Sequence, residues 1–236
     1  MARKRRLRGP TGPQGPVVLG IESGGDQLGV ALWRLPETIG EPTERWRLLE
    51  SVTSHRGHRH ADTLLGLADA ALRRQGLTSK DLALVGVGRG PGGFTGVRVG
   101  LATAIGLGLG LDLSVWPVDS LAVLARNAAG LGGVALPLFD ARKGEVYGAA
   151  YRVSASEAPE ALMPARVAPA ADVLAEARIV AGAEPLVVLG MGALAYGCAS
   201  PVPATWHVPS AVEAGWLAAT YWEAGRRIAE PPAADP

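Results

Sequence analysis

The sequence has a single cysteine, Cys198, among its 236 residues, which excludes a disulfide within the chain. One isolated thiol fits the reducing environment of the cytoplasm. Long apolar runs are also missing, because no stretch approaches the roughly 20 residues that a membrane-spanning helix requires. We therefore expect a cytoplasmic protein that has no contact with a membrane. The length suits one large domain or two domains of about 100 residues each.

Acidic residues are absent from the first eight positions, which instead contain five basic ones. Without these five, 18 basic residues stand against 22 acidic ones, so the rest of the chain is mildly acidic. Such a balance argues against a nucleic-acid-binding surface, which requires clustered positive charge. Residues 1–16 lack the apolar segment of a secretory signal, and we expect a disordered tail of no defined role. A weak electrostatic contact of this tail with RNA is the alternative.

Apolar runs that alternate with turn residues and helical patterns predict an α/β protein. Strands are expected at 17–21, 28–33, 46–52, 82–87, 135–139, 145–151 and 186–189. Helices are expected at 60–75, 97–111, 170–178 and 212–228.

The strand-turn-strand pattern of residues 17–33 recurs at 135–151 without a gap. This superposition places Glu22 on Asp140, so that each half has a carboxylate at the tip of its first hairpin. Each half later has a strand that leads into a glycine turn, which predicts a duplicated α/β unit. Matching acids in two such halves are typical of the actin, hexokinase and sugar-kinase architecture, in which a nucleotide and its metal bind between the lobes.

The predicted organisation has a first and a second α/β lobe. They are assigned to residues 17–118 and 119–230, and the second lobe includes the C-terminal helix at 212–228. Residues 231–236 are expected to be a flexible end.

The segment 90–100 reads GPGGFTGVRVG and looks like a phosphate-binding loop, but it lacks the required residues. A P-loop ends in Gly-Lys followed by Ser or Thr, whereas Gly96 is followed by Val97 and Arg98. The dinucleotide fingerprint fails as well, since no glycine occupies its last position. Thr95 is the predicted N-cap of the helix that follows. Free amides at that helix start could hold an anion, and a purely structural turn is the alternative.

Catalytic and metal-ligating sets are not expected in this chain. His55, His58 and His60 are three and two residues apart, unlike the four-residue spacing of a helical zinc pair. Cys198 and His207 lack a convincing third partner for nucleophilic catalysis. We therefore expect no catalytic residue, no metal ligand and no cofactor of the chain's own.

Four longer segments follow one another in a specific order: HADTLLGLADAAL, LALVGVGRGPGGFTGVRVGLATAIGLGLGL, VDSLAVLA and FDARKGEVYGAAY. Together they resemble the TsaB family, formerly described as glycoprotease-like proteins, from about residue 17 to 219. The resemblance implies an actin-like ATPase (ribonuclease H-like) fold with two similar lobes and a degenerate nucleotide cleft. The residues of the family's signature loop are Gly90, Pro91, Gly92, Phe94, Thr95, Gly96 and Arg98.

The resemblance also implies partners. TsaB-like proteins pair with the related catalytic subunit TsaD, and the ATPase TsaE joins them; TsaD transfers threonylcarbamoyl to N6 of the adenosine 3′ of the anticodon. We therefore expect a non-catalytic scaffold that reaches tRNA through the complex, while ATP and a metal ion are used by the partner subunits. A homodimer is a further expectation. The alternative function is a stand-alone metallopeptidase of the M22 type or an actin-like-fold ATPase.

In this family the pairing face is formed by the first two helices, which correspond to residues 60–75 and 97–111. The second of them contains four glycines, each costing about 1 kcal/mol relative to alanine in an isolated helix. Small residues of this kind let another helix approach closely, and burial of the helix within its own lobe is the alternative explanation for part of them. The interface residues predicted on these helices are Leu64, Leu65, Ala68, Val99, Thr103, Gly106 and Leu107.

A second candidate site is a vestigial nucleotide cleft or a contact with TsaE, formed by Glu22, Asp140, Arg142 and Glu145. The family pattern at the first turn is Asp-Thr-Ser or close to it, whereas this chain has Glu22, Ser23 and Gly24. Gly93 also stands where the family often has Ser. Because these changes remove hydroxyls, independent ATP hydrolysis is not expected. The alternative for residues 140–145 is a solvated turn.

Overall fold

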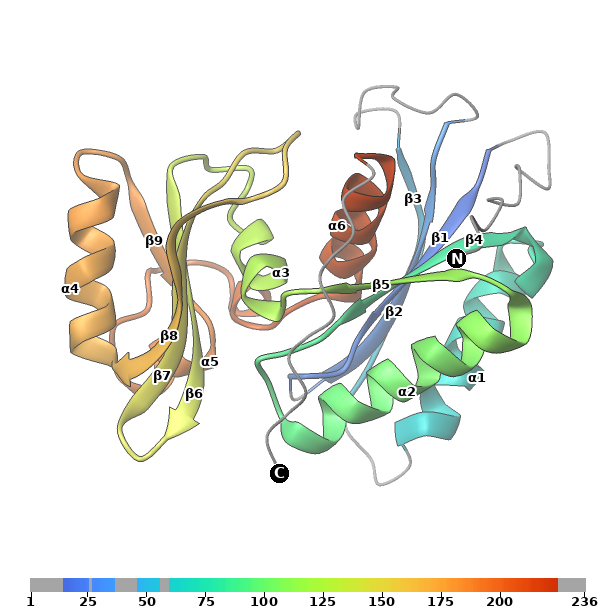
Figure 1. The fold of residues 1–236 in the computed structure, drawn as a ribbon, viewed down its shortest axis with the longest axis horizontal. Coiled ribbons are helices and arrows are strands. Elements are labelled where there is room, and N and C mark those ends of the chain that lie inside the picture. Colours follow the sequence, from blue (N-terminus) through green and yellow to red (C-terminus); the bar gives the residue numbers. More distant parts are fainter. Residues whose placement is uncertain (1–14, 26, 37–45, 56–59, 225–236) are drawn as a thin grey trace, which may run out of the picture.

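The computed structural model describes residues 15–25, 27–36, 46–55 and 60–224, and it contains two β-sheets. Helices lie between the sheets and on both outer faces (Figure 1). The expected tail up to residue 14, His58, and the end of the chain from residue 225 lie outside the described residues.

The first lobe is a five-stranded sheet with the strand order β3-β2-β1-β4-β5. Three strands are antiparallel neighbours: β1 (Val17–Glu22), β2 (Gln27–Arg34) and β3 (Arg47–His55). Two strands run parallel to β1: β4 (Leu82–Gly88) and β5 (Ser114–Val118). The outer face carries α1 (His60–Arg74) and α2 (Phe94–Leu111), and the short 3₁₀ helix η2 (Ser79–Asp81) precedes β4.

The second lobe repeats this order without a fifth strand, as β8-β7-β6-β9. Its antiparallel strands are β6 (Val134–Arg142), β7 (Glu145–Arg152) and β8 (Glu160–Pro169), and β9 (Leu186–Leu189) is parallel to β6. Two helices, α4 (Ala170–Ala181) and α5 (Met191–Ala195), pack against it. The repeated strand order confirms the duplicated α/β unit of the ribonuclease H-like fold.

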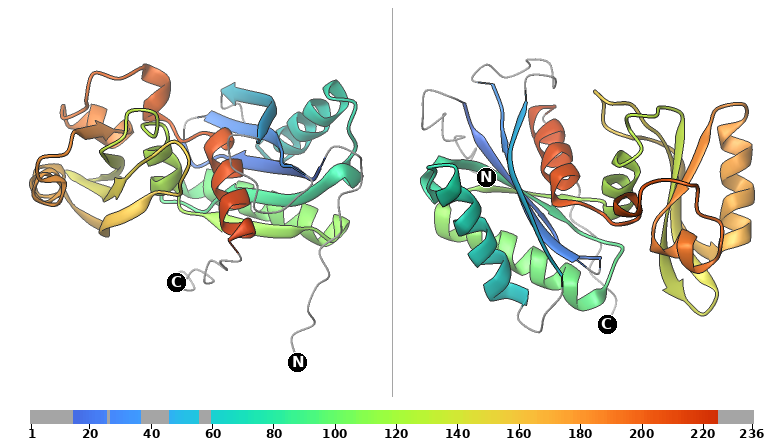
Figure 2. Two further views of the ribbon diagram at one scale, coloured as in Figure 1. Left: turned by 90° about the horizontal axis from the view of Figure 1, so that it is seen from above. Right: turned by 180° about the vertical axis from the view of Figure 1, so that it is seen from behind.

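Two helices fill the space between the sheets: α3 (Ser120–Arg126) and α6 (Ala211–Glu223) (Figures 1 and 2). The 3₁₀ helix η3 (Ala204–His207) precedes α6. A single apolar cluster joins Leu84 of the first sheet, Leu121 and Leu217 of these helices, and Leu189 of the second sheet. One core cluster therefore spans the two lobes, and each lobe has a further cluster of its own.

The C-terminal helix was expected in the second lobe, and the structure corrects this. Helix α6 packs on β1, β2 and β4 of the first sheet. Glycines make this contact close, because a Cβ added at Gly20 would overlap the Ala211 carbonyl oxygen and one at Gly86 would overlap Ala218. Close packing onto β1 and β4 explains why the helix joins the first lobe.

A largely buried ion pair ties the inner helices together. Arg126 Nε of α3 donates to Glu213 Oε2 of α6 at 2.9 Å, and its guanidinium lies 3.6 Å from the centre of the Trp216 ring. Arg126 Nη1 also donates to the Ser154 carbonyl oxygen, 2.8 Å away in the loop after β7. Burial raises the pKa of Glu213, and Arg126 opposes that rise. This clamp joins the second lobe to a helix that packs on the first.

Candidate functional site

The turn after β1, formed by Glu22, Ser23 and Gly24, fits into a socket of glycines. A Cβ added at Gly88 would overlap the Glu22 carboxylate, and one at Gly100 would overlap Ser23 Oγ. A Cβ at Gly92 would lie 2.8 Å from the Gly24 carbonyl oxygen. We call Glu22, Ser23 and Gly24 the 22–24 turn. Its packing gives a structural reason for three glycines at or beside the glycine-rich segment.

Hydrogen bonds surround the Glu22 carboxylate inside this socket. Its Oε1 accepts the backbone amides of Ser23 at 2.9 Å and Gly24 at 2.7 Å. Its Oε2 accepts the Ser120 hydroxyl at 3.3 Å, and Ser120 Oγ accepts the Gly90 amide at 3.1 Å. Burial raises the pKa of Glu22, and these hydrogen bonds oppose the rise. Glu22 is 1% exposed and acts as a buried structural carboxyl.

The same turn holds the beginning of α2. Ser23 Oγ donates to the Gly96 carbonyl oxygen at 2.8 Å, and the Gly93 amide donates to the Gly24 carbonyl oxygen at 2.6 Å. Gly93 is the N-cap, so α2 begins at Phe94 and Thr95 lies in its first turn. The predicted N-cap, Thr95, and the predicted start at residue 97 are therefore wrong, since the turn fixes the chain three residues earlier.

The remaining signature residues lie around the loop between β4 and α2. Gly90 has φ of +93°, which favours glycine, and Pro91 follows it on the surface-facing side of the loop. Phe94, Thr95 and Arg98 are exposed in the first turns of α2, and the Arg98 guanidinium lies 3.6 Å from the centre of the Phe94 ring. The signature thus combines a buried glycine socket with an exposed helix start.

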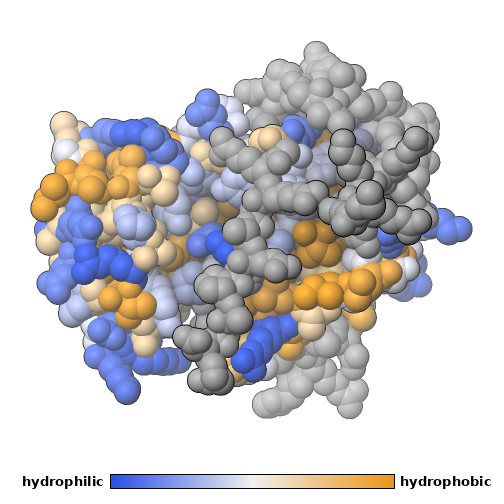
Figure 3. All heavy atoms as spheres, viewed as in Figure 1, coloured by the Kyte–Doolittle hydropathy of each residue, from blue (hydrophilic) through white to orange (hydrophobic). Residues whose placement is uncertain are grey.

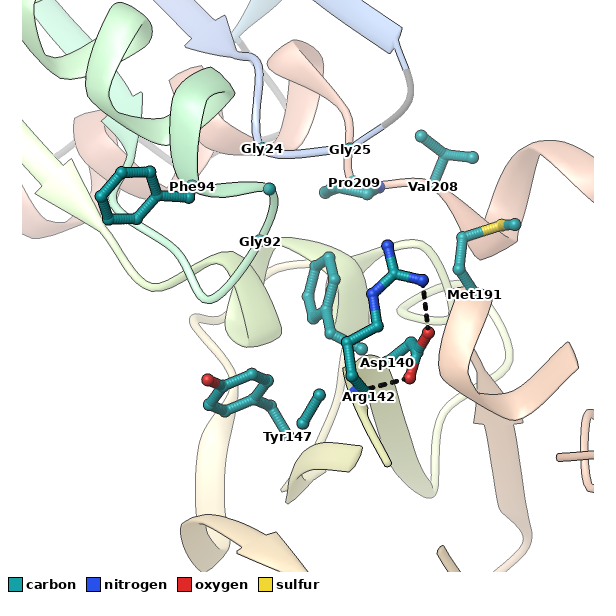
Figure 4. A pocket seen from close by; sticks show the side chains of 13 residues that line it. Gly24, Gly25, Gly92, Phe94, Asp140, Arg142, Tyr147, Met191, Val208 and Pro209 are labelled. Atoms are coloured by element: carbon teal, nitrogen blue, oxygen red, sulfur yellow. Dashed lines mark hydrogen bonds and ion pairs between the residues drawn. The ribbon is translucent and has the colours of Figure 1, made fainter. Parts of the chain in front are cut away.

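A cavity of about 400 Å³ opens between the lobes (Figure 4). The first lobe contributes Gly24 and Gly92, and the second lobe contributes Asp140, Arg142 and Tyr147. Arg142 lies at the tip of the β6–β7 hairpin, close to the Asp140 carboxylate (Figure 4). A single guanidinium beside glycine backbone could contact an anionic group, but it supplies no nucleophile or base.

Glu22 and Asp140, predicted to share one cleft, lie beside neighbouring cavities. Asp140 lines the 400 Å³ cavity, whereas Glu22 borders a pocket of about 150 Å³ together with Thr53 and Ser210, and both are lined by Val208 and Pro209. The 22–24 turn folds the Glu22 side chain inward, onto its own backbone amides. The two carboxylates therefore share a place in the repeated unit but face different surroundings.

Asp140 and Arg142 form a local pair at the rim of the cavity. Asp140 Oδ1 accepts the Arg142 amide at 2.8 Å and the Tyr196 hydroxyl at 3.2 Å, and its Oδ2 lies 3.4 Å from Arg142 Nη1. Arg142 and Lys143 have positive φ values of 70° and 53°, which side-chain-bearing residues rarely adopt. Glu145 is exposed opposite Arg142 in the strand pairing and does not line the cavity.

Histidine and cysteine have separate structural contacts here. The Gly190 amide donates to His207 Nδ1 at 3.1 Å, and burial lowers the pKa of His207. Cys198 Sγ donates to the Ala193 carbonyl oxygen at 3.7 Å, and burial raises the pKa of its thiol. A neutral thiol is a poor nucleophile. Within the described part of the chain, no three His, Cys, Asp or Glu side chains gather as a metal site.

The structure divides the predicted interface residues into two sets. Leu64, Ala68 and Thr103 are buried in their own lobe, so they offer little surface to a partner. Val99 and Leu107 are partly buried against the same core. Leu65 and Gly106 are exposed.

The sequence reasoning missed the most exposed apolar residues of α2. Ile105 is 52% and Leu109 is 74% exposed, and their spacing of four places them on one helix face. That spacing was a usable signal, but the nearly uniform apolarity of α2 concealed it. Helix α2 is long and apolar enough to cross a membrane by length and composition alone. Only 22% of it is buried within the protein, so most of this apolar helix is exposed or half-buried. An apolar band runs along this helix on the surface (Figure 3).

The glycines of α2 fall into two groups. Gly100 and Gly108 are required by the lobe itself, since a Cβ at Gly108 would lie 2.5 Å from Val115 Cγ2 and one at Gly100 would overlap Ser23. Gly106 and Gly110 have no atom within 4 Å of an added Cβ, and the same holds for Gly66 of α1. We call Leu65, Gly66, Ile105, Gly106, Leu109 and Gly110 the docking face.

Comparison with known proteins identifies relatives of the chain. Residues 49–184, more than half of its length, match the family model described as TsaD: tRNA N6-adenosine threonylcarbamoyltransferase. The Bacillus subtilis tRNA threonylcarbamoyladenosine biosynthesis protein TsaB is 33% identical over 135 residues, which cover 57% of this chain and 55% of that protein. The Escherichia coli protein of the same name is 33% identical over 137 residues, which cover 57% and 54%.

A solved structure from Pseudomonas aeruginosa, described as an uncharacterized protein with similarity to peptidase YeaZ, has a TM-score of 0.72 at 25% identity. The match covers 90% of this chain and 94% of that one. In sequence, the chain spans about half the length of the curated relatives it matches. The chain therefore belongs to the TsaB family, and it carries the TsaD-type sequence domain.

Proposed function

We propose that this chain is a non-catalytic scaffold subunit in the biosynthesis of tRNA N6-threonylcarbamoyladenosine, and that its docking face binds the catalytic subunit TsaD. TsaE joins through this pair, and tRNA is reached through the complex in the cytoplasm. ATP and a metal ion are used by the partner subunits. The names of its TsaB relatives and the match to the TsaD-type model support this pathway.

The observation that carries the proposal is the docking face itself. Ile105 and Leu109 lie one turn apart, and Gly106 and Gly110 beside them have open space where a side chain would be. A glycine inside a helix costs about 1 kcal/mol relative to alanine, and nothing within the lobe offsets that cost here. Close approach of another helix would offset it. Contiguous exposed apolar surface of this kind is typical of an interaction site.

A helical partner suits this surface best. Side chains of one helix pack into the grooves of another, and small residues bring the two axes closer together. A related subunit with the same fold would present its own first two helices, which would give a bundle of helices across the interface. A second copy of this chain presents the same face, so a homodimer is the alternative pairing when TsaD is scarce.

The internal contacts of the polar side chains support a role without catalysis. Glu22, His207 and Cys198 each have hydrogen bonds within the protein. Asp140 is paired with Arg142 at the cavity rim. Among the described residues, no observation supports the alternative of a stand-alone metallopeptidase or ATPase.

The test is a substitution on the docking face that leaves the fold intact. Ile105→Glu places a charge on a residue that is 52% exposed, so the monomer should fold while co-purification with TsaD is lost. Ile179→Glu is the matched control, because Ile179 is 79% exposed on α4 of the other lobe. It should pair as the unmodified chain does.

Circular dichroism and thermal melting establish whether each variant folds. Binding is then measured by titrating TsaD into each variant. A folded Ile105→Glu variant that binds TsaD with unchanged affinity would show that the docking face is not the interface.

A further inference from the structure

We infer that Glu22, Ser23 and Ser120 are positioning residues, which set the direction of α2 and thereby control how well the docking face fits its partner. This inference rests on the proposed docking function. The three side chains are buried, and none of them belongs to the docking face. Their effect on binding would therefore be transmitted through α2.

The network holds the glycine segment at successive points. The Ser120 amide donates to the Gly90 carbonyl oxygen at 2.9 Å, and the Gly90 amide donates to Ser120 Oγ at 3.1 Å. The Gly93 amide is bound by the Gly24 carbonyl oxygen, and the Gly96 carbonyl oxygen is bound by Ser23 Oγ. Three points within seven residues thus connect the start of α2 to β1 and α3.

Such fixing is needed because this segment has little conformational preference of its own. Its glycines can adopt many backbone angles. Helix α2 also has no hydrogen bond from an N-cap side chain, since its N-cap is Gly93. The hydrogen bonds of the 22–24 turn are therefore what orients the first turn of α2.

The chemistry of Glu22 supports a positioning role over a catalytic one. Both carboxylate oxygens are occupied by donors of the protein, and the side chain does not line the inter-lobe cavity. Burying a carboxyl is costly unless it is hydrogen-bonded. Fully satisfied buried polar networks define one unique arrangement of the segments they join. Here that arrangement includes the helix that carries Ile105 and Leu109.

The experiment deletes hydroxyls within the network and measures binding to TsaD. Ser23→Ala removes the hydrogen bond to the Gly96 carbonyl oxygen. Ser120→Ala removes the two hydrogen bonds of its hydroxyl, to Glu22 and from the Gly90 amide, and keeps the backbone bond to the Gly90 carbonyl oxygen. We expect each to weaken TsaD binding by about tenfold. Hydrogen exchange at the amides of residues 93–100 should become faster in both variants.

Val173→Ala is the matched control for loss of stability. Val173 is fully buried on α4, in the core cluster of the second lobe, which contains no residue of α1, α2 or the 22–24 turn. It should lower the melting temperature without changing TsaD affinity or exchange at residues 93–100. Glu22→Gln should retain binding, because its amide oxygen still accepts the two backbone amides, whereas Glu22→Ala should lose it.

Ile105→Glu is run alongside to separate the two proposals. If Ile105→Glu abolishes binding while Ser23→Ala and Ser120→Ala bind TsaD as the unmodified chain does, the positioning role is overturned and the docking face stands. If a folded Ile105→Glu variant binds normally, both proposals are overturned. Weakened TsaD binding in both serine variants, with unchanged binding in Val173→Ala, supports the positioning role.

Discussion

The two lobes repeat one strand order, yet the first hairpin of each has a different environment. Glu22 in the first lobe is buried and accepts three hydrogen bonds within the protein. Asp140 in the second lobe lies at the cavity rim and pairs with Arg142 and Tyr196. The helix after the fourth strand differs too, because α2 has 18 residues and α5 has five.

The difference teaches how one repeated unit can serve two purposes. In the first lobe, the hairpin tip is folded inward and holds a long helix whose outer side is apolar. In the second lobe, the corresponding helix is short and the hairpin tip stays open at the cavity. The polar contacts of Glu22 are therefore internal to the fold, whereas those of Asp140 are local to a surface turn.

The largest expected effect concerns the clamp that joins the lobes. Arg126→Ala should lower the free energy of unfolding by about 3 kcal/mol, because Glu213, whose side chain is 19% exposed, would lose its partner and Trp216 its packing against the guanidinium. Arg152→Ala, on the exposed side of the second lobe, should have no measurable effect. Urea denaturation checks both variants. If Arg126→Ala and Arg152→Ala lowered the free energy of unfolding equally, the contacts of Arg126 would not stabilise the junction of the lobes.

The next prediction compares the two hairpin carboxylates directly. Glu22→Ala should lower the free energy of unfolding by about 2 kcal/mol, since it leaves buried amides and the Ser120 hydroxyl without an acceptor. Asp140→Ala should cost clearly less, because water can replace its contacts. Thermal and urea unfolding measure the pair. If Asp140→Ala lowered the free energy of unfolding more than Glu22→Ala, Asp140 rather than Glu22 would be the structural carboxylate.

A smaller effect distinguishes the two groups of glycines in α2. Gly106→Ala should raise the free energy of unfolding of the monomer by up to about 1 kcal/mol and weaken TsaD binding, because its site is open in the monomer. Gly108→Ala should lower stability, because its Cβ would lie 2.5 Å from Val115 Cγ2. Melting curves and TsaD titration are the measurements. The melting temperature should rise for Gly106→Ala and fall for Gly108→Ala. Shifts in the same direction would contradict the division of the glycines into two groups.

The smallest effect is a change in pH dependence. Burial raises the pKa of Glu22, so its contribution to stability is fully present below the ordinary glutamate pKa and is lost as the pH rises through the raised value. Glutamine keeps the acceptor and does not titrate. The stability of Glu22→Gln relative to the unmodified chain should therefore increase as the pH rises from the ordinary glutamate pKa into the mildly alkaline range. If the difference in stability between Glu22→Gln and the unmodified chain stayed constant across that range, Glu22 would not have a raised pKa.

Much of the fold could be predicted from local patterns. The predicted strand at 186–189 coincides with β9, and the repeat of 17–33 at 135–151 appears as two equivalent hairpins. Strand β8 was missed because Pro164 argues against a strand, but an edge strand tolerates proline. The position of α6 was missed because it depends on glycines of distant strands.

The site was harder to predict than the fold. The sequence singled out the 22–24 turn and the glycine segment, but not that one fits into the other, because they lie about 70 residues apart. The two docking helices were expected, whereas the side of each that faces solvent was not. Helix α2 is apolar nearly all round, so Thr103 and Ile105 could not be assigned to opposite sides without the packing of the lobe.

The most direct test of the docking claim is tRNA modification in a reconstituted system. TsaD and TsaE are combined with tRNA, ATP, a threonylcarbamoyl donor and either the unmodified chain, Ile105→Glu, Ile179→Glu, or no added chain. The docking claim predicts threonylcarbamoyladenosine formation with the unmodified chain and with Ile179→Glu, and a level with Ile105→Glu no higher than without the chain. Full modification in the absence of this chain, or with folded Ile105→Glu, would contradict it.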